Sequence, residues 1–148
     1  MKPYVGHIEK ETLDNANFRK VVFTGKYAQL VVMCIQPGDE IGNEMHKTVD
    51  QFFRIEKGEA KFVFENGKED SVVKDGDAVI VPAGTWHNVI NNSKKDVLKV
   101  YTIYSPPNHP ADRVQKTKAE ADAAEHAEEA EKAKAAKPAK PAPKKAKK

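Results

Sequence analysis

The feature that constrains the fold most is a succession of short extended runs between residues 26 and 104, each ended by a turn signal. The run Tyr27–Ile35 is β-branched and apolar on both faces and stops at Pro37-Gly38, which indicates a central strand. Asn66-Gly67 joins two further runs, and this dipeptide strongly favours a hairpin because both residues tolerate positive φ. No helical period competes in this region, so we expect an all-β sandwich or barrel.

The chain divides into a folded part and a tail of different composition. We expect one domain over residues 1–110, in which Phe18 and the run Val21–Phe23 form an added strand or edge segment. Residues 111–148 hold 13 alanines, no aromatic residue and one aliphatic residue, so they have little apolar surface to bury. Within this tail, residues 117–136 have high helix propensity and could form a frayed, solvated helix, followed by an extended, disordered chain.

Charge is unevenly distributed between these two parts. Residues 1–131 carry 17 Lys and Arg against 22 Asp and Glu, whereas residues 132–148 carry eight Lys and no acidic residue. The tail could therefore contact a polyanion such as nucleic acid, weakly and without sequence preference. It has no aromatic residue for base stacking, so a solubilising or tethering extension is the alternative.

Cysteine usage and hydropathy bear on the compartment. The single cysteine, Cys34, cannot form an internal disulfide and gives no support for an oxidising compartment. The N-terminal residues contain no continuous apolar stretch of the kind a secretion signal needs, and no window of about 18 apolar residues could span a bilayer. We therefore expect a cytoplasmic protein with no membrane association.

Four potential metal ligands carry the chemistry. Glu44 and His46 are two residues apart, so on a strand their side chains project from the same face. Gln51 is five residues beyond His46, an odd offset that would place it on the opposite face of one continuous strand. It can be a ligand if a turn at Lys47–Asp50 makes it the start of the neighbouring strand. His87 comes after another turn, so the four side chains arise from three strands. Two imidazoles and one carboxylate suit Zn, Mn, Fe, Ni or Co as a divalent ion and leave open positions for water or substrate.

At these residues the sequence resembles the cupin superfamily. The second cupin motif, G-x5-P-x-G-x2-H-x3-N, is matched in full by Gly76, Pro82, Gly84, His87 and Asn91. The first motif, G-x5-H-x-H-x4-E-x6-G, is matched in spacing from Gly38 to Gly58. Glu44 stands at its first histidine and Gln51 at its glutamate, so only His46 keeps its family identity among the three.

The resemblance spans roughly residues 28–104 and implies a β-barrel of the double-stranded β-helix or jelly-roll type, often dimeric, with a metal near one end of the barrel. The two departures offset each other in charge, because a carboxylate is gained at position 44 and lost at position 51. The implied ligand set is therefore Glu44, His46, Gln51 and His87. In the alternative, Glu44 is an ordinary loop residue and the histidines are unrelated, but the complete second motif argues against it.

Aromatic and sulfur side chains could line a pocket beside the metal. Phe53, Tyr101, Trp86 and Met33 fit this role, although such residues in a β-barrel belong more often to the core. Tyr101 is the one candidate proton donor, provided that it faces inward, and both registers of its strand stay open. No general base is identifiable.

Three basic residues have weaker signals. Arg54 and Lys99 lie on expected strands and could bind an anionic substrate, but a solvent-facing position is favoured for both. His109 follows the pair Pro106-Pro107 and could close over a pocket, but a lone surface histidine is the favoured interpretation.

The leading functional hypothesis is a metal-dependent enzyme that acts on a small polar metabolite: a sugar, a sugar phosphate or a keto acid. Related small cupins include sugar isomerases, so the resemblance implies isomerase-like or epimerase-like chemistry at a Lewis-acidic metal. An Fe(II) dioxygenase is a second hypothesis. A third is a non-catalytic module that binds a small ligand and is tethered by its basic tail. The resemblance implies a homodimer, since barrels of this type are often dimeric, but the sequence itself does not fix the oligomeric state.

Overall fold

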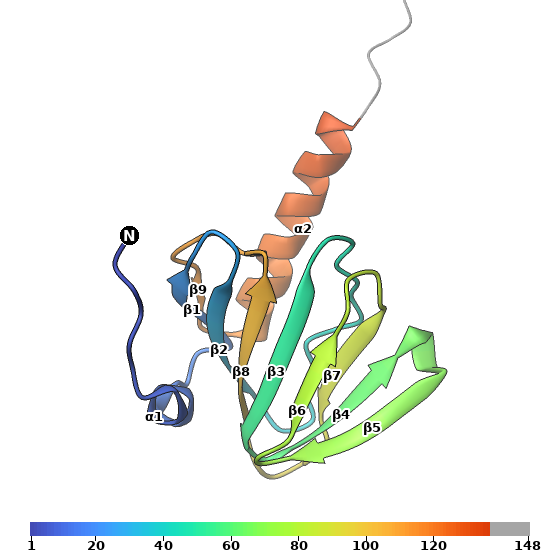
Figure 1. The fold of residues 1–148 in the computed structure, drawn as a ribbon. Coiled ribbons are helices and arrows are strands. Elements are labelled where there is room, and N and C mark those ends of the chain that lie inside the picture. The colour runs from blue at the N-terminus through green and yellow to red at the C-terminus, as the bar shows by residue number, and fades with distance from the viewer. Residues whose placement is uncertain (137–148) are drawn as a thin grey trace, which may run out of the picture.

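The computed structural model describes residues 1–136, and the extended lysine-rich chain expected over 137–148 lies outside the described residues. The strands form two antiparallel sheets that face each other (Figure 1). Within residues 1–136, no helix is long and apolar enough to cross a membrane. The elements in chain order are α1 (Ile8–Asp14), β1 (Arg19–Thr24), β2 (Gln29–Ile35), β3 (Asp50–Lys57), β4 (Glu59–Phe64), the 3-10 turn η1 (Glu65–Gly67), β5 (Glu69–Lys74), β6 (Ala78–Val81), β7 (His87–Asn91), β8 (Leu98–Ser105), β9 (Val114–Gln115) and α2 (Lys118–Ala135).

The hydrophobic core lies between the two sheets. The larger sheet has the strand order β6-β3-β8-β2-β1-β9, and the smaller has the order β5-β4-β7. Phe53 of β3 meets Phe62 of β4 across the core, with ring centroids 5.0 Å apart. Side chains along β3 and β8 alternate between buried and partly exposed positions, as expected of strands with one face on a core. The expected all-β barrel of jelly-roll type is therefore confirmed.

Three features expected from local sequence signals, a hairpin, an added strand and a central strand, are present in the structure. The hairpin of β4 and β5 turns through Asn66 and Gly67, whose φ angles are 57° and 96°. The added strand expected near Phe18 is β1, which pairs with β2. The central strand is β2, which lies between β1 and β8. It is apolar on both faces because α1 packs against its outer side, where Val32 and Cys34 are buried.

The fold continues beyond residue 110, where the folded domain was expected to end. The short strand β9 pairs with β1, and Gln115 lies opposite Arg19. The expected helix is confirmed as α2, which leaves the barrel beside β9 and extends beyond the strands (Figure 1). Ala121 anchors α2 to the core and is 6% exposed. Composition did not indicate this packing, since backbone hydrogen bonds hold β9, and the helix is held by the small side chain of Ala121 and an ion pair between Arg113 and Glu128.

Candidate metal centre

Glu44 and His87 lie directly opposite each other at one end of the smaller sheet. The N–H of Glu44 donates to the carbonyl oxygen of His87 at 2.8 Å, and the N–H of His87 donates back at 2.9 Å. Side chains that are directly opposite in an antiparallel pair project to the same side and lie close together. The backbone thus brings the carboxylate of one segment to the imidazole of another.

Glu44 and His46 both lie outside the named strands, in contrast to the expectation that they share one, and Glu44 makes only an isolated bridge to His87. The carbonyl oxygen of His46 accepts a hydrogen bond of 2.8 Å from the N–H of Gly84, in the turn before His87. Gly84 has a φ of 86°, a left-handed conformation that favours glycine. This turn therefore fixes the His46 segment beside β7.

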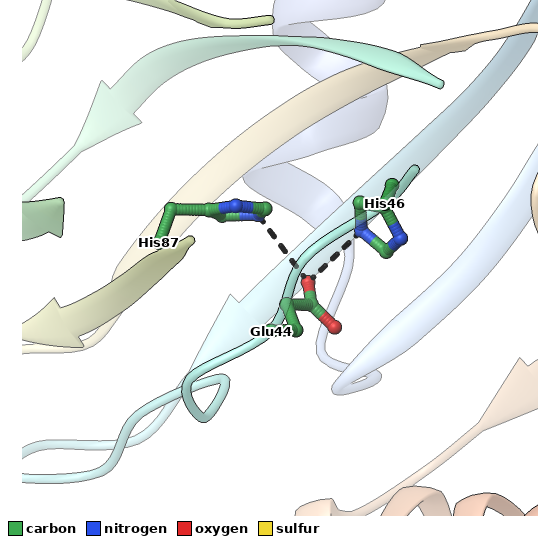
Figure 2. Close-up of side chains that lie close together, drawn as sticks. All are labelled: Glu44, His46 and His87. Atoms are coloured by element: carbon green, nitrogen blue, oxygen red, sulfur yellow. Dashed lines mark ion pairs between the residues drawn. The ribbon is translucent and has the colours of Figure 1, made fainter. Parts of the chain in front are cut away.

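The three side chains converge on one carboxylate oxygen (Figure 2). Glu44 Oε1 lies 3.4 Å from His46 Nε2 and 3.6 Å from His87 Nε2. One potential ligand atom from each residue falls within 4.8 Å of the other two. Both Nε2 atoms are buried and have no hydrogen-bond partner among residues 1–136. The geometry therefore leaves two imidazole nitrogens facing one anionic oxygen.

A hydrogen bond behind His87 prepares its ring for a metal. His87 Nδ1 lies 3.0 Å from the carbonyl oxygen of Thr85, so Nδ1 carries the proton and donates it to this oxygen. The lone pair is then left on Nε2, the atom that faces Glu44. Metal-bound histidines are oriented by this same kind of outer contact.

The electrostatics of the centre favour a cation. Burial alone raises the pKa of the Glu44 carboxyl, but the facing His46 and His87 imidazoles outweigh burial and hold this pKa well below its ordinary value. Burial alone lowers the pKa of His87, but the Glu44 carboxylate and the Thr85 carbonyl raise it above its ordinary value. Glu44 therefore stays ionised and attracts positive charge to the two rings.

Gln51 lies near the start of β3, after the turn that the sequence suggested, and is 1% exposed. Its Nε2 donates to Thr102 Oγ1 at 3.0 Å, and its Oε1 has no partner among the described residues. A buried carbonyl oxygen without a donor is costly, and a cation could satisfy it. The unpartnered nitrogens of His46 and His87, which face the Glu44 carboxylate, fit a divalent transition ion better than they fit a closed network of hydrogen bonds.

A family model matches the stretch of chain that holds the candidate centre. The model described as the cupin domain matches residues 31–104, which include Glu44, His46, Gln51 and His87. This chain belongs to the cupin family. Cupin folds commonly bind metal ions, and the centre described above offers glutamate and histidine ligands for one.

Relatives of this cupin include bacterial and viral proteins. It is 46% identical over 126 residues to the uncharacterized protein YrkC of Bacillus subtilis strain 168, across 82% of this chain and 67% of that protein. It is 40% identical over 119 residues to the uncharacterized protein L612 of Acanthamoeba polyphaga mimivirus, across 80% of this chain and 74% of that protein. The crystal structure of BH2720 from Bacillus halodurans is 43% identical, with 82% of this chain and 95% of that chain covered and a TM-score of 0.80.

A pocket of ≈ 230 Å³ opens beside the metal centre of this cupin. Glu44 and His46 line it together with residues of α2. A bound water needs only about 10–15 Å³ of such space, so the pocket has room for a small ligand as well as for water. The residues that line it from outside the range matched by the family model include Arg19, Asn108, His109, Arg113, Glu125 and Lys132.

Arg19 is a pocket residue that the sequence did not indicate. It stands on β1, is 7% exposed, and its Nη1 donates to Gln115 Oε1 at 2.6 Å. Its guanidinium carbon lies 5.3 Å from the centroid of the Phe18 ring. A single basic residue at the start of a strand has no sequence pattern of its own, so only the pairing of β1 with β9 reveals its position.

Tyr104 and His109 form a second pair that the sequence did not assign. His109 lines the pocket, contrary to the favoured surface position, and its Nε2 lies 3.1 Å from the Tyr104 hydroxyl. Burial raises the pKa of Tyr104 to about 12. Burial, followed by the Arg19 guanidinium, lowers the pKa of His109 to about 3. Both side chains are therefore uncharged at neutral pH.

Gln29 explains why His109 is held there. This buried side chain accepts hydrogen bonds from the N–H groups of Asn108 and His109 through Oε1, at 3.1 and 2.9 Å. Its Nε2 donates to the His109 carbonyl oxygen at 2.8 Å. Both polar atoms of the Gln29 side chain therefore hold the loop after β8 against the start of β2.

Tyr101 does not meet the condition that its role as a proton donor required. Buried side chains on β8 are Leu98, Val100, Thr102 and Tyr104, so Tyr101 projects from the opposite face. Its ring packs near Phe52, with centroids 6.0 Å apart. The inward tyrosine of this strand is Tyr104, because the strand register places even-numbered residues on the core side.

The remaining candidates divide between core and surface. Phe53 and Met33 are core residues, as favoured from the sequence, whereas Trp86 is 37% exposed and belongs to neither core nor pocket. Arg54 pairs with Glu56 at 3.6 Å, and Lys99 donates to the backbone of α1. Neither Arg54 nor Lys99 lines the pocket, so neither is placed to bind a substrate there, and both are partly buried rather than fully solvent-facing.

Proposed function

We propose that this cupin is a metal-dependent enzyme that acts on a small polar metabolite, with Glu44, His46, Gln51 and His87 as the metal ligands. One observation carries the proposal: two buried imidazole nitrogens without hydrogen-bond partners face the Glu44 carboxylate at the wall of a pocket. A purely structural cluster would be expected to close its hydrogen bonds, and a purely structural metal site would be expected to have no pocket beside it.

A divalent ion held there would act as a Lewis acid on a carbonyl or hydroxyl oxygen of the substrate, which suits isomerisation or epimerisation of a sugar, sugar phosphate or keto acid. Glu44 supplies the single negative charge of the ligand set and leaves the ion electrophilic. His109 replaces Tyr101 as the side chain expected to assist, since it lines the pocket as a neutral imidazole. When the Tyr104 hydroxyl donates to Nε2, the proton of His109 is carried on Nδ1.

The test begins with the metal content of the full chain, purified without a metal-affinity tag. We expect close to one transition ion per chain by elemental analysis, and strong loss of it in His46→Ala and His87→Ala. The loaded protein is then screened against sugars, sugar phosphates and keto acids for isomerised products. Wild-type metal content in both alanine variants would refute the centre.

The same screen separates the other two hypotheses. Oxygen consumption that requires Fe(II) would replace isomerisation with dioxygenase chemistry. Ligand binding without turnover by the loaded protein would instead identify a binding module. The homodimer, the cytoplasmic location and weak binding of polyanions by the tail stay predictions from the sequence.

A further inference from the structure

We propose that Arg19 binds the carboxylate of a small substrate with a single negative charge, next to the metal centre. The inference rests on the proposed function and names the substrate class within it. Arg19 lines the same pocket as Glu44 and His46, yet only 7% of its surface is exposed. A ligand that reaches the metal through this pocket therefore passes a buried guanidinium.

The charge of Arg19 has no counterion in the described part of the chain. Within residues 1–136, no carboxylate lies within ion-pair distance of it, and its Nε has no hydrogen-bond partner. The Gln115 side chain that accepts from Nη1 is neutral. Burial of a charge without an opposite charge is unfavourable, and removal of such a charge is often neutral or stabilising. An anion in the pocket would supply what the fold does not.

Glu44 does not serve as this counterion. Its Oε1 is already placed between His46 and His87, at 3.4 and 3.6 Å from their Nε2 atoms. A divalent ion bound by these residues would neutralise the negative charge of Glu44, which would then be unavailable to Arg19. The metal-loaded protein would then hold two positive centres on one pocket, the ion and Arg19. A substrate with an oxygen for the ion and a carboxylate for Arg19 matches that arrangement.

The charge balance of the pocket favours one negative charge rather than two. Its lining carries the carboxylates of Glu44 and three glutamates of α2, against the cations Arg19, Arg113 and Lys132. A divalent ion brings the formal charge to +1, which one carboxylate neutralises. A phosphate group carries two negative charges, which exceeds the formal charge of +1, and the excess negative charge would be repelled by the glutamates of α2. A planar carboxylate also matches the planar guanidinium fork.

The experiment measures binding of pyruvate to the Zn(II)-loaded full chain by calorimetry, with neutral methyl pyruvate and inorganic phosphate as comparison ligands. The key variant is Gln115→Glu, which is nearly isosteric and places a carboxylate on the guanidinium of Arg19. A second variant, Arg19→Met, removes the charge. Two controls change the same charges elsewhere: Gln36→Glu at an exposed position and Arg54→Met on the outer face of β3.

We expect the wild-type protein to bind pyruvate at least tenfold more tightly than methyl pyruvate or phosphate. Gln115→Glu and Arg19→Met should each weaken pyruvate binding at least tenfold, with Zn(II) content unchanged and a Tm equal to or above that of the wild type. Both controls should bind pyruvate as the wild type does. If Arg19 had only a structural role, Arg19→Met would lower the Tm of the protein, and Gln115→Glu would leave its affinity for pyruvate unchanged.

Three outcomes overturn the inference: no pyruvate binding by the wild type, equal or tighter binding of phosphate, or pyruvate affinity that is independent of both variants. Failure of the proposed function is recognised separately, as a wild-type protein that takes up no Zn(II). Pyruvate binding is then measured on that metal-free protein, and independence from Arg19 still refutes the assignment. If Arg19→Met does not fold, Gln115→Glu decides the question alone.

Discussion

The backbones of Glu44 and His87 donate hydrogen bonds to each other, at 2.8 and 2.9 Å, and so fix the positions of two proposed metal ligands from segments 43 residues apart in the chain. This pairing depends on main-chain groups alone and is independent of which side chain stands at position 44. A glutamate can therefore occupy the place where the cupin motif has a histidine, without loss of position. The scaffold sets where the ligand lies, and the side chain sets its charge.

The first prediction follows from that charge. Glu44→Gln removes the only carboxylate of the ligand set and should weaken divalent-ion affinity by at least about tenfold. Gln51→Glu adds a negative charge, so it should keep or tighten metal binding but lower turnover, because the ion becomes a weaker Lewis acid. Equilibrium dialysis with elemental analysis measures the first effect. Full metal occupancy in Glu44→Gln, alongside its loss in His46→Ala, would mean that Glu44 is not a ligand.

The second prediction concerns Asn91, a motif residue that supports the fold rather than the chemistry. Its Nδ2 donates to the carbonyl oxygens of Ile35 and Asp96 at 3.0 and 2.8 Å, and its Oδ1 accepts from the Ser93 N–H at 2.9 Å. Asn91→Ala leaves these groups without partners and should lower the free energy of unfolding by about 3 kcal/mol.

Urea unfolding of the metal-free protein measures this loss. The neighbouring Asn92 makes one exposed side-chain contact, so Asn92→Ala is a matched control that should change stability by less than about 0.5 kcal/mol. Folded Asn91→Ala should bind metal as the wild type does. Selective loss of metal at unchanged stability would place Asn91 in the site instead.

Much of the barrel could be predicted because its signals are local. The apolar run of β2, the Asn-Gly turn before β5 and the spacing of the second motif each depend on a few neighbouring residues. The strand β9 could not be predicted, since backbone hydrogen bonds to β1 hold it and Val114 is 51% exposed. A two-residue strand has no period to detect.

The same division applies to the site. His46 and His87 could be found from motif spacing, because the spacing encodes the turn that brings them together. Arg19 had no signal and His109 was the less favoured alternative, since both reach the pocket through long-range contacts, with Gln115 and Gln29. Tyr101 was preferred to Tyr104 because the sequence left the register of β8 open, and a shift by one residue exchanges the two faces of a strand.

The third prediction uses the pKa of His109, which burial, followed by the Arg19 guanidinium, lowers from 6.5 to about 3. The unfolded chain therefore binds a proton between these pH values and the folded protein does not. This contribution to stability is fully present above pH 6.5 and is lost as pH falls toward the folded pKa, with a slope of at most about 1.4 kcal/mol per pH unit. His109→Gln should flatten the slope.

Urea unfolding of metal-free protein from about pH 7 down to about pH 5 tests this, because Glu44 contributes only below its ordinary pKa of 4.5. His87 has a raised pKa and contributes with the opposite sign, but equally in both proteins. The difference between wild type and His109→Gln therefore isolates His109. Parallel curves would show that the pKa of His109 is the same in the folded protein as in the unfolded chain.

The last prediction concerns two truncations of the C-terminal segment. Deletion of residues 117–148 removes α2, whose only buried side chain among the described residues is Ala121. We therefore expect a loss of about 1 kcal/mol or less. Deletion of 111–148 also removes β9 and two flanking bonds, from the Val21 N–H to the Arg113 carbonyl at 2.9 Å and from the Phe18 N–H to the Lys116 carbonyl at 3.2 Å.

The longer deletion should cost about 2 kcal/mol more than the shorter one, because β1 becomes an edge strand and its backbone groups lose their partners. Urea unfolding of the two truncated proteins beside the full chain gives both differences. Equal stability of the two truncations would mean that β9 adds nothing to the sheet. A large loss of stability in the shorter deletion would instead show that α2 is held by more than Ala121, so that the helix lining the pocket is part of the folded core.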